Sequence, residues 1–207
     1  MTAASPNQRS RRGFLLGAGA GSAVVAGGFM LSGGARESSE PVTASTAADH
    51  GFCTDMSTHH VQALAMCQRV LGRDTGDPVQ AAAAEVLQTQ AIEVGMMRAW
   101  LADWGQSTSP PESVMAWMHD GVAMRVGMMP GLASDDEMRS LSLAEGMAQG
   151  KMWIELMRAH HVGGVAMAEA AIDLVSVEKV RRLARTQVEV QTFEITQYDE
   201  LLSTVYR

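Results

Sequence analysis

Apolar side chains recur at helical spacing along most of the chain after residue 48. In residues 49–71 the spacing of three and four that marks one helix face joins Phe52, Met56, His60, Ala63 and Cys67. Gly72 ends this segment, as glycine commonly does at a helix C-terminus. By the same reasoning the chain predicts four long helices, at residues 49–71, 77–104, 147–175 and 176–203.

Local signals predict where these helices begin and how they are connected. Asp77 is expected to cap the second helix and Ser176 the fourth. Residues 105–133 hold three of the six prolines, which predicts a long connection with a short helix around residues 113–124. Ser134 then starts a capping-box pattern that opens another short helix, to about residue 144.

The chain repeats itself at an offset of 101 residues. Residues 55–66 read DMSTHHVQALAM and residues 156–167 read LMRAHHVGGVAM, and six of these twelve positions are identical. The second helix of each half carries Gln-x-x-Glu at the same offset. Two related helical hairpins joined by a long crossover predict a four-helix bundle with approximate two-fold symmetry. We expect one domain over 49–207, with repeat one at about 49–104, the crossover at 105–145 and repeat two at about 146–203.

The duplicated segment concentrates imidazole and thioether groups, which suit soft metal ions. Four of the six histidines lie in its two His-His dipeptides, and methionines flank both. The candidate metal ligands are His59, His60, His160, His161, Met56, Met66, Met157 and Met167. Alternative ligands, or hydrogen-bond partners of the histidines, are Gln90, Glu93, Gln191, Glu194, Asp55 and Cys67.

The orientation of the dipeptides bears on which ion they suit. Neighbouring residues on a helix diverge by about 100°, so one imidazole of each pair is expected to point inward. We expect His60 and His161 to be that inward pair. Imidazole with thioether suits Cu(I), whereas a set that includes Glu93 and Glu194 suits Cu(II) or Zn(II). In the alternative interpretation the histidines only pack in the core, hydrogen-bonded to the glutamines and glutamates without any metal.

The chain resembles the DUF305 family in its Met-x-x-His-His-x-x-x-x-x-Met frames, its Gln-x-x-Glu pairs and the segment MMPGLASDDEMRSL. The resemblance covers about residues 47–203. It implies a ferritin-like fold of two two-helix repeats, bacterial secretion, and a functional His-His motif without an assigned activity. Asp55, Cys53 and Cys67 have no like counterpart in the second repeat, so a role for them would belong to one half only.

The first 32 residues are typical of an export signal rather than of the folded domain. Residues 10–16 read SRRGFLL, the twin-arginine pattern, and a weakly apolar run follows to about residue 32. We expect Tat-type export to an extracytoplasmic location, with residues 33–48 as a disordered spacer. An uncleaved segment would instead tether the protein to the membrane. Cys53 and Cys67, about 21 Å apart on one helix, are not expected to form a disulfide with each other.

Several classes of function lack support in the sequence. A formal charge of −7 without a basic patch argues against a nucleic-acid partner. A conventional di-iron oxidase needs two Glu-x-x-His motifs, which neither repeat carries, and no phosphate loop or nucleophile elbow is present. The sequence therefore favours a non-enzymatic, exported metal buffer, for copper first and for zinc or another transition metal second. A structural or interaction module of the cell envelope and an atypical metal-dependent oxidoreductase are the alternatives, and no catalytic residue or protein partner is named.

Overall fold

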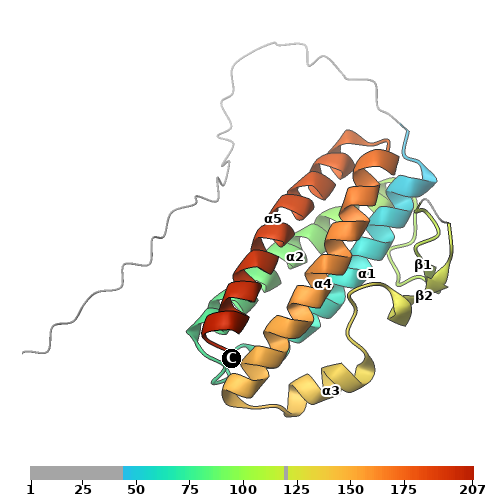
Figure 1. Ribbon diagram of the computed structural model, residues 1–207. Coiled ribbons are helices and arrows are strands. Elements are labelled where there is room, and N and C mark those ends of the chain that lie inside the picture. The colour runs from blue at the N-terminus through green and yellow to red at the C-terminus, as the bar shows by residue number, and fades with distance from the viewer. Residues whose placement is uncertain (1–43, 119–120) are drawn as a thin grey trace, which may run out of the picture. The chain divides into compact units, whose positions relative to one another are not determined.

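Five α-helices account for most of the chain that the computed structural model describes, residues 44–118 and 121–207 (Figure 1). The predicted export segment and most of the predicted spacer lie outside these residues. The four long helices confirm the predicted all-α, ferritin-like bundle of two two-helix repeats joined by a long crossover. They are α1 (Ala47–Val70), α2 (Asp77–Asp103), α4 (Gly146–Leu174) and α5 (Glu178–Thr204), and the short α3 (Asp135–Leu143) lies in the crossover.

The bundle is built from two helical hairpins that meet through α1 and α4. Helix α1 packs on α2, and α4 packs on α5, while α2 and α5 make at most marginal contact with each other. Phe52 near the start of α1 shares a cluster with Ala171 near the end of α4, whereas Val70 shares one with Trp153. Helices α1 and α4 therefore run antiparallel, so their midpoints cross where the two His-His dipeptides lie (Figure 1).

Carboxylates help to hold the starts of α1 and α5, although not always the residues that the sequence suggests. Thr46 caps α1 in a capping box with Asp49. The Asp49 carboxylate also accepts the backbone N–H groups of Ser176 and Val177, at 3.3 and 2.9 Å. The predicted Ser176 cap is therefore wrong: Val177 is the N-cap of α5, without a side-chain cap, and Asp49 supplies the acceptor. Asp77 is likewise the first residue of α2 rather than its cap.

The crossover contains a β-hairpin where a short helix was predicted around residues 113–124. Strand β1 (Ser113–Val114) pairs antiparallel with β2 (Met124–Arg125), and a 3-10 turn, η1 (Val126–Met128), follows. Met115 takes a φ of 71°, a left-handed conformation that an α-helix cannot accommodate. Farther along, Ser134 opens α3 with the predicted capping box.

The apolar core is divided into two clusters at the two ends of the bundle. One contains Phe52, Cys53 and Met56, and the other contains Cys67 and Trp153. Both cysteines are free, as the sequence predicts. Within the described residues, no helix is long and apolar enough to cross a membrane. The buried polar side chains at the middle of α1 and α4 lie between the two clusters, and they form the candidate site.

Candidate metal centre

All four histidines of the two dipeptides are buried, with no exposed side-chain surface. The rings of His59 and His160 stack across the α1 and α4 crossing, with centroids 3.7 Å apart and planes inclined by 23°. The expectation that His60 and His161 alone point inward is therefore wrong. Residues of α2 and α5 contact the histidines on one flank of the crossing and the crossover contacts them on the other, and every imidazole is fully buried.

His60 and His161 each donate a hydrogen bond to a glutamate that lies 33 residues later in the chain. The Nε2 atom of His60 lies 2.7 Å from Oε2 of Glu93 on α2, and Nε2 of His161 lies 2.7 Å from Oε2 of Glu194 on α5. Because an ionised carboxylate only accepts, each Nε2 is the donor of its pair. Each half of the chain thus contains the same hydrogen-bonded histidine–glutamate pair.

His59 is held by the crossover instead of by a helix. Its Nε2 donates to the backbone carbonyl oxygen of Pro130, 3.1 Å away. Gly163 on α4 makes this contact feasible, because a Cβ there would overlap the Pro130 carbonyl. Gly131, at a φ of 83°, also lies close to α4, because a Cβ there would fall 2.7 Å from the carbonyl oxygen of Ala159. The two glycines thus allow residues 130–131 to pack close to His59.

The remaining ring nitrogens have no hydrogen-bond partner in the part of the chain that the structure describes. They are Nδ1 of His59, His60 and His161, and both nitrogens of His160. Burial, with nearby histidines adding to it, lowers the pKa of His59 to about 3 and that of His160 well below its usual value of 6.5. These two imidazoles are therefore neutral at pH 7 and present unused lone pairs, which are costly to bury.

Three of these histidines lie close enough together that they could hold a metal ion. His59, His60 and His160 each offer one nitrogen, and the three atoms lie within 4.8 Å of one another. An imidazole whose other N–H donates to a carboxylate or carbonyl oxygen is the usual form of a metal-bound histidine. The lone pairs of the stacked His59 and His160 rings lie in two nearly parallel planes and do not converge on one point. One ring must therefore rotate before both can bind the same ion. Rotation of His160 would break no hydrogen bond of its ring among the described residues.

Gln187 and Tyr198 on α5 belong to this site, although the sequence reasoning missed both. Nε2 of Gln187 donates to Oε2 of Glu93 at 2.8 Å, and the Tyr198 ring lies 5.4 Å from that of His161 in an edge-on arrangement. The repeat does not reveal Gln187, because its counterpart at an offset of 101 is Val86. The helical spacing of Gln187, Gln191, Glu194 and Tyr198 would have placed all four on one face.

The four candidate methionines are fully buried on either side of the histidines. Met56 and Met167 lie in one apolar cluster, and Met66 and Met157 in the other. One methionine of each repeat thus lies in each cluster, and their role as ligands stays a prediction. Gln90 and Gln191 are also buried, and their side-chain oxygens have no hydrogen-bond partner among the described residues.

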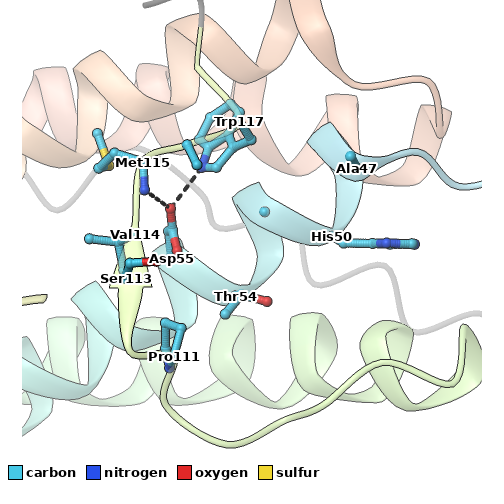
Figure 2. Close-up of a pocket in the computed structure, with 11 residues that line it drawn as sticks. Ala47, His50, Thr54, Asp55, Pro111, Ser113, Val114, Met115 and Trp117 are labelled. Atoms are coloured by element: carbon cyan, nitrogen blue, oxygen red, sulfur yellow. Dashed lines mark hydrogen bonds between the residues drawn. The ribbon is translucent and has the colours of Figure 1, made fainter. Parts of the chain in front are cut away.

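Asp55 and Cys67 make contacts other than those of the histidine cluster. Oδ2 of Asp55 accepts the backbone N–H of Met115 at 2.7 Å and the indole N–H of Trp117 at 2.8 Å, beside a pocket of about 330 Å³ (Figure 2). Asp55 thus holds the β-hairpin of the crossover against α1. Burial raises the pKa of Cys67 to about 12, so this side chain is a neutral thiol at pH 7.

Comparisons with known proteins agree with the fold. The family described as "Domain of unknown function (DUF305)" matches residues 49–202. No protein of curated function matches the chain.

Three solved proteins share the fold. A DUF305 protein of Streptomyces coelicolor, described as a candidate secreted protein, is 38% identical over 75% of this chain and 92% of its own, with a TM-score of 0.68. A DUF305 fragment from Deinococcus radiodurans is 29% identical over 78% and 99%, with a TM-score of 0.66. CopM in a Cu(I)-bound form is 21% identical over 77% and 98%, with a TM-score of 0.60, and its Cu(II)-bound form is 22% identical over 76% and 97%, with a TM-score of 0.59.

Proposed function

The chain belongs to the DUF305 family, and within it we propose that this protein binds a transition-metal ion through His59, His60 and His160, as an exported buffer for copper. The observation that carries the proposal is the meeting of three buried imidazole nitrogens within 4.8 Å. Two of these rings have their Nε2 atom bonded to an oxygen. Such a set is costly when empty and favourable when it surrounds a cation.

Copper is the first ion to test. Neutral imidazoles surrounded by buried thioethers suit Cu(I), and CopM, which shares this fold, is solved with Cu(I) and with Cu(II). Zinc is the second ion, since it accepts imidazole and carboxylate ligands. The competing interpretation is a non-catalytic envelope module, in which the bonds of His60 to Glu93 and of His161 to Glu194 serve only to order the core.

Metal titration of the purified protein separates the two interpretations. We expect one Cu(I) ion per chain under anaerobic conditions, measured by competition with a coloured chelator, with Cu(II) and Zn(II) titrated in parallel. His160→Phe keeps a flat ring against His59 but removes the nitrogens, so it should abolish binding while circular dichroism stays unchanged. His50→Ala, on α1 but outside the cluster, is the matched control and should bind like the natural protein. Absence of binding at micromolar metal, or equal binding by His160→Phe, rules out this site.

We propose further that the protein works outside the cytoplasm after Tat-type export. The twin-arginine pattern at Arg11 and Arg12 supports this, together with the description of the Streptomyces coelicolor relative as a candidate secreted protein. Replacing both arginines by lysine should leave the full-length precursor in the cytoplasm, as fractionation and immunoblotting would show. Unchanged export of this double variant would instead indicate another route.

A further inference from the structure

The four-helix bundle is open on one side. Helices α2 and α5 pack on α1 and α4 but not along each other, and a groove of about 540 Å³ lies between them. Its walls come from both helices and include Ile92, Met96 and Leu183. Ile92 and Met96 are 56% and 40% exposed, so the groove presents two large apolar side chains to solvent.

Glu93 connects this groove with the histidine cluster. It lines the groove, its side chain is 19% exposed, and its Oε2 atom accepts hydrogen bonds from both His60 and Gln187. A single carboxylate therefore touches solvent on one side and a fully buried imidazole on the other. Among the described residues Pro130 covers His59, apolar clusters fill both ends of the bundle, and Glu194 beside His161 is less exposed than Glu93, at 11%.

The groove also carries groups that bear on the passage of a cation. Met96 follows Glu93 by three residues, so its thioether lies on the same helix face as the carboxylate. Two positive side chains oppose a cation: Arg182 lines the groove, and the ammonium of Lys179 lies 5.0 Å from the ring centre of Trp100. The charge of Arg182 is therefore expected to slow the approach of a metal ion.

We propose that the groove between α2 and α5 is the entrance through which a soft cation reaches the histidines and leaves them, with Glu93 as the last group before His60 and Met96 at the rim. This inference rests on the proposed metal binding. The ion keeps the same charge as it enters and leaves, and only coordination bonds form and break. The entrance controls how fast the ion exchanges, whereas the histidines set how tightly it is held.

The test is to block the groove and to measure rates and affinity separately. Thr186→Trp places a large ring in the α5 wall, and Thr192→Trp, at an exposed position of α5 outside the groove, is the matched control. With Cu(I) as the probe, stopped-flow mixing gives the association rate, and extraction by a chelator gives the dissociation rate. Thr186→Trp should slow both by about 10-fold or more and leave Kd unchanged, while Thr192→Trp should change neither.

A second variant tests the electrostatic part of the inference. Arg182→Gln removes a positive charge from the rim and should raise the association rate by about 2- to 5-fold at low salt, with a smaller effect at high salt. The proposed entrance is wrong if Thr186→Trp exchanges the ion as fast as the natural protein, or if the association rate of Arg182→Gln does not rise. Either result leaves the proposed metal site intact. A natural protein that binds no ion overturns the proposed function itself, and the entrance with it.

Discussion

At the scale of single residues, Glu93 and Glu194 determine which ring nitrogen of their histidine carries the proton. Glu93→Gln replaces a charged acceptor by a weaker amide oxygen, so the His60 ring becomes less basic and less firmly oriented. We expect metal affinity to fall by about 10- to 100-fold, measured by chelator competition. Glu189→Gln, at an exposed position of α5, should leave affinity unchanged. Equal affinities for the two variants would show that the carboxylate plays no part in binding.

Acid should destabilise the metal-free fold. The pKa of His59 is lowered by burial to about 3, from a usual value of 6.5. Between these two pH values His59 is protonated in the unfolded chain but not in the folded chain. The free energy of unfolding is therefore highest above pH 6.5 and falls as pH decreases toward 3. At pH 5 the loss from His59 alone is about 2 kcal/mol. Urea unfolding at pH 7.5 and pH 5 measures it, and a pH-independent free energy of unfolding over this range would contradict the burial of a neutral ring.

The repeat predicted the histidines of this site but not their complete surroundings. His59 and His160 stand at equivalent positions, so duplication alone marks them as a pair. Pro130 and Gln187 have no equivalent in the other half, and each reaches the site through a contact more than 70 residues away in sequence. Such contacts depend on how the elements pack, which periodicity along one helix does not report.

At the scale of the elements, the four long helices were predicted to within two residues at each end. Their periodicity, glycines and prolines are local signals, and local signals are sufficient for a helix boundary. The β-hairpin was missed because a distant residue determines its shape. Asp55 on α1 accepts the N–H of Met115, in the left-handed conformation that interrupts any helix there.

Two glycine substitutions test how closely the crossover packs against α4. In Gly163→Ala the new methyl group meets the carbonyl of Pro130, so overpacking should cost about 1–3 kcal/mol and disturb the contact with His59. Gly95→Ala, in α2, meets open space and should gain up to about 1 kcal/mol from helix propensity. Chemical denaturation of both variants gives the two values, and effects of the same sign would contradict the close approach at Gly163.

At the scale of the whole molecule, binding at the centre should stabilise both hairpins together. The ligands come from α1 and α4, which join the two halves of the bundle, so the ion binds the folded state alone. Copper at 100 times its Kd adds about 2.7 kcal/mol, which raises Tm by about 5–10 °C for a chain of this size. Differential scanning calorimetry measures the shift. His50→Ala should retain it and His160→Phe should lose it, whereas a shift in both would place the ion elsewhere.

The stacked rings of His59 and His160 also have a spectroscopic consequence. Each imidazole lies over the face of the other at a centroid distance of 3.7 Å, where the circulating π electrons of one ring shield the protons of its neighbour. Their carbon-bound protons should therefore resonate upfield of ordinary histidine signals in the empty protein. An ion that turns His160 away separates the rings and removes this shielding. The carbon-bound proton signals of these two rings thus report, without any added label, whether the centre is empty or filled.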